Sequence, residues 1–198
     1  MSLADIQTVS GDYVQGSFTL LYRSGERAAS ALFFARHIDT HAREGETKLA
    51  LRYFRAAVSE FRSIFDLLPA DLKAEGLSQQ WNRSKFKIEL ETHPLIAVLI
   101  KVRNFAVHSD RVQGFGREFN VTVFGDGPAR REAISSIFID QLDRQALGRE
   151  LNDVPDESLQ WFNRQVRHWP AQLIVQEAVY QASIPLRNFL ATAKRRVV

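Results

Sequence analysis

The segment KVRNFAVHSD contains an arginine, an asparagine and a histidine in the pattern Arg103-Asn104-x3-His108. A histidine, whose ordinary pKa is about 6.5, can accept the proton of a ribose 2′-hydroxyl or donate one to a leaving 5′-oxygen at neutral pH. The guanidinium of an arginine can stabilise the negative charge that gathers on the phosphate in the transition state. The amide of an asparagine can orient the histidine or hold a phosphate oxygen. Together these residue types can cleave RNA without a metal ion, leaving a 2′,3′-cyclic phosphate and a 5′-hydroxyl.

The pattern is weak evidence alone, because the chain has 26 lysines and arginines and 5 histidines and a few such pairs arise by chance. A second pair, Arg36 and His41 in ARHIDTH, has the same spacing. It falls at the end of the first expected helix and ranks below the first pair. The segment Arg187-Asn188-Phe189 repeats the RNF triplet with no histidine behind it. The weight of the motif therefore depends on the elements that position it.

The first part of the chain has the periodicity of two helices. Apolar residues recur at spacings of three and four from residue 17 to about residue 41, and again from about residue 47 to 68. The polar segment REGE at 43–46 predicts a tight turn between them. Pro69 is expected to end the second helix, because proline has no backbone N–H. This pattern predicts an antiparallel helical hairpin with a short connection.

The motif lies at the end of a third expected helix. Pro94 suits a first helical position, and Thr92 is a candidate N-cap just before it. The apolar segment PLIAVLIKV then leads to Arg103. On a straight helix at about 100° per residue, positions 103 and 108 lie about 140° apart. They can act on one phosphate only if the helix distorts after Arg103 or if two subunits each contribute residues.

The remaining sequence predicts a β-hairpin and then a return to helix. Apolar and polar residues alternate in FNVTV, and ISSIFID is a second strand candidate, so residues 117–141 are expected to form the hairpin. Helical periodicity resumes near Asp156. Pro170 should restart or kink this last helical part, and Pro185 should bend it.

A helical hairpin followed by an apolar helix that ends in Arg103-Asn104-x3-His108 resembles the HEPN domain family (higher eukaryotes and prokaryotes nucleotide-binding). That family is a four- to five-helix bundle, and its ribonuclease branch carries Arg-polar-x3-His near the end of an inner helix. The resemblance covers residues 17–110 and 156–194. It implies that Arg103 takes the arginine position, Asn104 the polar one and His108 the histidine. It also implies a homodimer in which two motifs face each other, in a prokaryotic toxin or defence setting.

The chain is thus expected to be mainly α, a HEPN-like helical bundle with an inserted β-hairpin. We expect a single domain over residues 1–198, in which residues 111–155 form the hairpin-containing insertion. The insertion has no counterpart in the family pattern. Because a lone hairpin is marginally stable in water, it should pack on the helices or on a partner.

Other interpretations of the same residues stay open at this point. His108 and Asp110 could cap the helix end while Arg103 pairs with an acid, in which case the motif serves only the fold. Glu60 or Asp66 could be the partner of Arg103 whether the motif is structural or catalytic. The bundle could be a non-catalytic dimer that binds a nucleotide, an RNA or a protein such as an antitoxin. The hairpin could provide the docking edge of an interaction subunit.

No cofactor and no metal site is expected. His37 and His41 have a helical spacing that can bind zinc, but they lack the glutamate of His-Glu-x-x-His, and His93 has nothing to recommend it as a third ligand. The glycines of GFGREF lack the spacing of a nucleotide-binding loop. The chain has no cysteine, which excludes disulfides and thiolate metal sites.

The composition is typical of a globular protein inside the cell. Hydrophobic residues make up 45% of the 198 residues, and the net charge is only +3. The first residues do not resemble a signal peptide, and no apolar run approaches the roughly 20 residues that span a bilayer. We therefore expect a cytoplasmic protein without a membrane partner, whose charge supports RNA binding only weakly.

Overall fold

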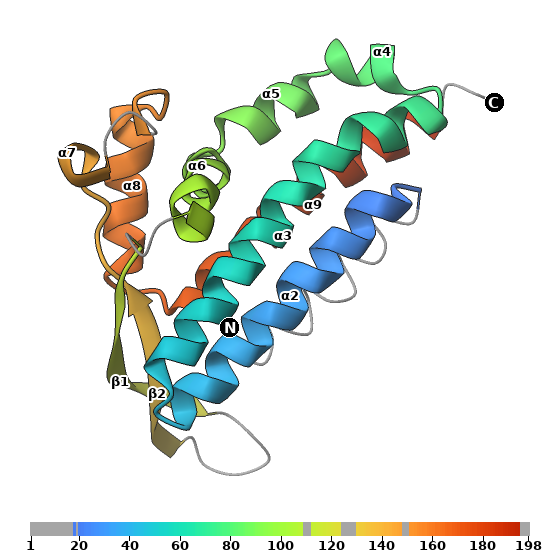
Figure 1. The fold of residues 1–198 in the computed structure, drawn as a ribbon. Helices are drawn as coiled ribbons and strands as arrows, with labels where there is room; N and C mark the ends of the chain where they lie inside the picture. Colours follow the sequence, from blue (N-terminus) through green and yellow to red (C-terminus); the bar gives the residue numbers. More distant parts are fainter. Residues whose placement is uncertain (1–17, 19, 109–111, 124–129, 148–150, 195–198) are drawn as a thin grey trace.

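The computed structural model describes residues 18, 20–108, 112–123, 130–147 and 151–194. The elements in chain order are α2 (Tyr22–Arg43), α3 (Thr47–Ala74), α4 (Ser78–Asn82), α5 (Lys85–Thr92), α6 (Pro94–His108), β1 (Gly114–Val123), β2 (Arg130–Ile139), α7 (Arg144–Leu147), α8 (Asp156–Val166) and α9 (Ala171–Lys194). This arrangement confirms the prediction of a mainly helical fold with an inserted two-stranded β-hairpin (Figure 1).

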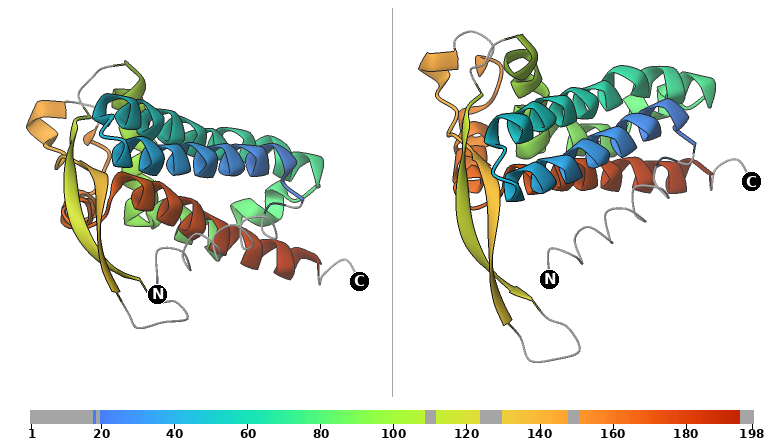
Figure 2. Two further views of the ribbon diagram at one scale, coloured as in Figure 1. Left: turned by 90° about the horizontal axis from the view of Figure 1, so that it is seen from below. Right: turned by 60° about the horizontal axis from the view of Figure 1, so that its bottom comes forward.

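The predicted helical hairpin is formed by α2 and α3, which lie side by side and antiparallel (Figure 1 and Figure 2). A stripe of small and apolar side chains on α2 permits the close approach of α3. Its buried residues are Ser24, Ala28, Ala31, Ala35, Ile38 and Ala42. The turn between the helices depends on Gly45, whose φ of +77° lies in the left-handed region that glycine adopts without strain.

The helix α3 does not end at Pro69, as the sequence predicted, but continues to Ala74. Pro69 is exposed, whereas Asp71 and Leu72 beyond it are buried. Asp71 Oδ2 accepts hydrogen bonds from the backbone N and the Oγ of Ser24 at 2.8 and 2.7 Å. Ser24 lies in the first turn of α2, where backbone N–H groups lack partners within the helix. This contact favours the additional helical turn in spite of the proline.

Residues 69–92 form the end of α3 and the short helices α4 and α5. Thr92 does not cap α6, in contrast to the prediction, because its Oγ1 donates to the carbonyl oxygen of Ile88 in the last turn of α5. Pro94 begins α6 as predicted. The third helix of the sequence pattern is therefore confirmed, but its cap is not.

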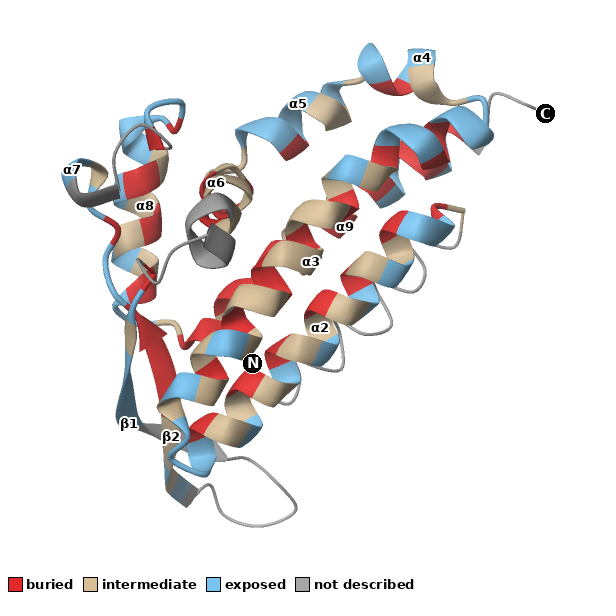
Figure 3. Cartoon of the chain, viewed as in Figure 1, coloured by how far each residue is buried: buried red, intermediate tan, exposed pale blue. Residues whose placement is uncertain are grey.

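The β-hairpin is shifted slightly toward the N-terminus relative to the predicted residues 117–141, because β1 begins at Gly114 and pairs there with Ile139, the last residue of β2. Residues 136–139 of β2 are buried, whereas residues 115–118 of β1 are exposed (Figure 3). The strand β2 contacts α2, α3 and α9. The hairpin thus packs on the helices through β2. This packing was expected, because an isolated two-stranded hairpin is only marginally stable in water.

The helix α9 contacts α2, α3, α5, α6 and β2 and supplies much of the core. Its fully buried side chains include Ile174, Val175, Ala178, Val179, Ala182 and Leu186. It begins directly after Pro170, as predicted, and continues as helix through Pro185. One hydrophobic cluster joins side chains of the helices to Ile137 and Ile139 of the hairpin.

The helices differ widely in length, from 4 residues in α7 to 28 in α3. Within the described part of the chain, none of them has both the length and the hydrophobicity that crossing a bilayer requires.

Candidate functional site

The helix α6 carries the Arg103-Asn104-x3-His108 motif at its C-terminal end and contacts α3 and α8 (Figure 1). The helix runs without a break to His108, so it is not distorted after Arg103. Positions 103 and 108 therefore lie about 140° apart around its axis, on different faces. Arg103 and His108 could meet at one phosphate through a distortion of the helix or through a site shared by two subunits. The distortion does not occur.

The side chain of Arg103 is half-buried, and its Nε is buried without a hydrogen-bond partner among the described residues. No carboxylate among the described residues forms an ion pair with this guanidinium. A buried donor that lacks a partner costs about 1–3 kcal/mol. A phosphate oxygen that reached this donor would form a charge-assisted hydrogen bond with it.

The two acids that the sequence offered as partners of Arg103 are engaged elsewhere. Glu60 Oε2 accepts a hydrogen bond from Arg27 Nη1 at 3.0 Å. Asp66 Oδ1 accepts one from Arg62 Nε, also at 3.0 Å. The interpretation in which Glu60 or Asp66 neutralises Arg103 is therefore wrong.

The side chains of Asn104 and His108 lie outside what the structure describes, and so does Asp110 as a whole. The roles predicted for Asn104 and His108, and the helix cap that His108 and Asp110 could form, stay predictions. The backbone of positions 104 and 108 is helical.

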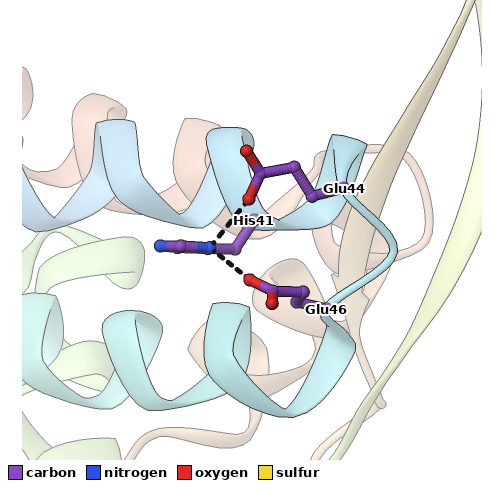
Figure 4. Close-up of side chains that lie close together, drawn as sticks. All are labelled: His41, Glu44 and Glu46. Atoms are coloured by element: carbon purple, nitrogen blue, oxygen red, sulfur yellow. Dashed lines mark hydrogen bonds and ion pairs between the residues drawn. The ribbon is translucent and has the colours of Figure 1, made fainter.

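The second arginine–histidine pair meets a different environment. His41 lies at the end of α2, where its Nδ1 is 2.6 Å from Glu46 Oε2 and 3.2 Å from Glu44 Oε2 (Figure 4). Arg36 lies five positions earlier and is exposed, on a different face of α2. The structure thus brings two carboxylates to His41, and the spacing His41-x2-Glu44-x-Glu46 is the signal from which this group could have been found.

His37 does not join these carboxylates. Its ring stacks on Tyr53 with 4.9 Å between the centroids. The other stacking partner of Tyr53 is His41, at 5.0 Å and with the ring planes only 2° apart. The rings of His37 and His41 also stack on each other, with 6.1 Å between their centroids, so the two histidines and Tyr53 form one aromatic cluster.

His93, which follows the last residue of α5, is a third histidine with a distinctive environment. Its Nδ1 is buried and lacks a hydrogen-bond partner among the described residues. Its ring and that of Trp161 form a T-shaped pair with 6.2 Å between the centroids. Burial lowers the pKa of His93 below its ordinary value, and the Glu177 carboxylate on α9 opposes part of that shift. His93 is therefore neutral at neutral pH.

Two surface cavities lie around α4 and α5, and neither is lined by Arg103. The first has a volume of about 360 Å³, and Arg83, Lys85, Phe86 and Phe189 are among its lining residues, none of which is acidic. The second has about 280 Å³ and is largely apolar, with Trp81 on its wall. The first cavity combines positive charge with aromatic rings, a combination that suits nucleotides.

No protein-family model, no curated protein and no solved structure matches this chain. The resemblance to the HEPN family consequently rests on the motif in α6 and on the helical architecture that carries it.

Proposed function

We propose that this protein is a metal-independent endoribonuclease of HEPN type, which acts as a homodimer on RNA in the cytoplasm as a toxin or defence effector. The observation that supports this proposal most is the state of Arg103. The residue is half-buried near the end of α6, and within the described part of the chain its Nε lacks a hydrogen-bond partner and no acid neutralises it. An arginine that served only the fold would be expected to have such partners.

The reaction needs a base, an acid and a stabilised transition state. In the proposed reaction, one His108 takes the proton of the ribose 2′-hydroxyl, whose oxygen attacks the adjacent phosphorus. The bond to the 5′-oxygen breaks, and this oxygen receives a proton from the second copy of His108 or from water. Arg103 holds the non-bridging oxygens, and Asn104 orients the imidazole. The products are a 2′,3′-cyclic phosphate and a 5′-hydroxyl.

The geometry of α6 favours a site made from two chains. The helix is continuous through His108, so positions 103 and 108 lie on different faces of it. A two-fold axis that passes between two copies of α6 would place Arg103 of one chain next to His108 of the other. The enzyme should therefore be inactive as a monomer.

The proposal is tested by incubating the purified protein with end-labelled RNA in the presence of EDTA. The parent should produce fragments that end in a cyclic phosphate. Arg103→Ala and His108→Ala should each lower the rate by about 100-fold or more, as expected when a charged transition-state partner or a general base is lost. The matched control is Arg36→Ala, which removes the arginine of the second pair and should leave the rate unchanged.

A mixing experiment tests the shared site directly. Arg103→Ala and His108→Ala protein are each inactive alone, but a mixed dimer retains one Arg103 and one His108 on opposite chains. If the site is shared, mixing the two variants should restore part of the cleavage. If each chain carries a whole site, the mixture should stay inactive. All variants must keep the circular dichroism spectrum and the oligomeric state of the parent.

A second candidate function is a non-catalytic dimer that binds RNA or a nucleotide. It is favoured by the cavity near Arg83 and Lys85, which has two cations, two phenylalanine rings and no acidic lining residue. If the parent binds RNA without cleaving it, and if Arg83→Gln with Lys85→Gln weakens that binding while Arg103→Ala does not, this alternative replaces the ribonuclease. A protein antitoxin would instead be expected to cover the end of α6 and to block cleavage.

A further inference from the structure

The turn between α2 and α3 brings three metal-ligating side chains to one point (Figure 4). A ring nitrogen of His41 and one carboxylate oxygen each of Glu44 and Glu46 lie within 4.8 Å of one another. His41 belongs to the last turn of α2, Glu44 follows that helix and Glu46 precedes α3. The donors converge because the chain reverses at Gly45, so the arrangement follows from the turn itself.

Two carboxylates share one imidazole in this group. His41 Nδ1 lies 2.6 Å from Glu46 Oε2 and 3.2 Å from Glu44 Oε2. Neither glutamate forms an ion pair with a lysine or arginine of the described residues, and the neighbouring Arg43 pairs with Asp39 at 2.9 Å instead. Because like charges this close repel each other, a cation placed between the two carboxylates would be stabilised.

The ring of His41 is held in position before any ligand arrives. Its side chain is only 18% exposed, whereas those of Glu44 and Glu46 are 57% and 51% exposed. The ring of Tyr53 lies flat against it at 5.0 Å, and Tyr53 is itself stacked on His37. A ligand that is already oriented loses less conformational entropy when it binds, and the two exposed carboxylates are free to adjust around it.

We propose that His41, Glu44 and Glu46 bind one divalent transition-metal ion of the Zn²⁺ type. A ring nitrogen with two carboxylate oxygens suits such ions, whereas Mg²⁺ and Ca²⁺ prefer oxygen ligands alone. Donors around a tetrahedral zinc ion lie about 3.4 Å apart, so the Glu46 oxygen needs to move outward by less than about 1 Å. Water would occupy the fourth position, since the glutamates face solvent. The ion would join the end of α2 to the start of α3.

This metal site goes beyond the proposed ribonuclease and does not depend on it. Its ligands come from the α2–α3 turn, whereas the proposed catalytic residues belong to α6. It also revises the expectation that the chain has no metal site, because the partners of His41 are the two turn glutamates and not His37. Cleavage of RNA in EDTA and binding of Zn²⁺ are separate measurements, so either proposal can fail without the other.

The test uses the full chain after dialysis against a chelator. Zn²⁺ is titrated in competition with a chromogenic chelator, and the melting temperature is followed in parallel. We expect one tightly bound equivalent of Zn²⁺ and a higher melting temperature with Zn²⁺ but not with Mg²⁺. His41→Ala, and the nearly isosteric pair Glu44→Gln with Glu46→Gln, should each weaken binding by at least about 10-fold, because even the loss of an outer partner of a ligand costs that much.

A histidine control identifies the site. His168→Ala removes an exposed histidine next to α8 and should bind Zn²⁺ as the parent does. Absence of a tight equivalent, or an unchanged affinity in the double glutamine variant, would overturn the proposal. In that case the two glutamates serve only as hydrogen-bond partners of His41. If His41→Ala does not fold, the double glutamine variant decides alone.

Discussion

Asp71 and Ser24 close the α2–α3 hairpin at the end opposite to its turn. A single carboxylate oxygen of Asp71 accepts hydrogen bonds from both the backbone N and the Oγ of Ser24, which lies 47 residues earlier in the chain. Both residues are buried. The carboxylate therefore serves an N–H group of α2 that no carbonyl within the helix can reach.

The first prediction concerns this pair. Asp71→Ala should lower the free energy of unfolding by about 2–3 kcal/mol, because it leaves two buried donors of Ser24 without an acceptor. Ser24→Ala should cost only about 1 kcal/mol, because the backbone bond to Asp71 remains. Urea denaturation followed by circular dichroism measures both values. Equal losses in the two variants would contradict the importance of the backbone bond.

The second prediction compares two glycines of β1. A Cβ atom added to Gly114 would lie 2.5 Å from the carbonyl oxygen of Phe138 and 3.0 Å from a methyl group of Leu51, whereas one added to Gly116 would meet only Thr47 Oγ1 at 3.5 Å. Gly114→Ala should therefore destabilise the protein by about 1–3 kcal/mol, as overpacking does. Gly116→Ala should be neutral or slightly stabilising.

Both glycine variants are measured by the same denaturation experiment, so that each is the control of the other. A Gly114→Ala protein as stable as the parent would mean that β1 can shift away from β2 at this position.

The third prediction concerns the attachment of the hairpin to the bundle. Ser136 Oγ in β2 donates to Gln172 Oε1 of α9 at 2.9 Å, and Gln172 Nε2 donates to Asp39 Oδ1 of α2 at 3.3 Å. Gln172→Leu removes both bonds and puts an apolar side chain of similar size in place of the amide. We expect a loss of about 1–3 kcal/mol, since Ser136 and Gln172 are buried and the hydroxyl loses its partner.

Hydrogen exchange locates this effect in the chain. Amide protection should fall in residues 130–139 and change little in residues 47–60 of α3. Uniform loss of protection would mean that the hairpin and the helices open together.

The fourth prediction is a pH dependence that arises from His93. Burial keeps the pKa of His93 in the folded protein below that of the unfolded chain, which is about 6.5. The unfolded state therefore binds this proton more readily. The contribution of His93 to stability is complete above about pH 6.5 and decreases as the pH falls from there toward the lowered folded pKa.

Urea denaturation between about pH 5 and pH 8 tests this expectation. His93→Gln should reduce the loss of stability on the acidic side, because glutamine does not titrate. His168→Gln, at an exposed position, should retain the profile of the parent. An unchanged profile in His93→Gln would show that other groups cause the acid sensitivity.

The parts of the fold that follow from local pattern could be predicted from the sequence. The apolar periodicity of α2 and α3, the start of α6 at Pro94 and the alternation in β1 and β2 are properties of neighbouring residues. The end of α3 could not be predicted, because the helix continues past Pro69, where Asp71 forms hydrogen bonds with Ser24. A contact between residues this far apart leaves no trace in the periodicity.

The candidate site shows the same limit. The residue types at Arg103, Asn104 and His108 indicate a chemistry, but the state of Arg103 depends on other elements. Glu60, on the neighbouring helix α3, pairs with Arg27 of α2 and not with Arg103. The group around His41 has a local spacing in the sequence, but the spacing alone does not show that the side chains meet. Glu44 and Glu46 flank Gly45, and the reversal of the chain there brings both to one imidazole.

The position of α9 has a consequence for how the protein is made. Contacts between α2 and α3 link segments that are close in the sequence, such as Ser24 and Asp71, which are 47 residues apart. This helical hairpin can therefore form during translation. Gln172 reaches Asp39 across 133 residues. Until α9 leaves the exit tunnel, the apolar faces of α2, α3 and α6 that it covers remain open to water and to chaperones. The core and the placement of the hairpin can therefore be completed only after α9 has been translated.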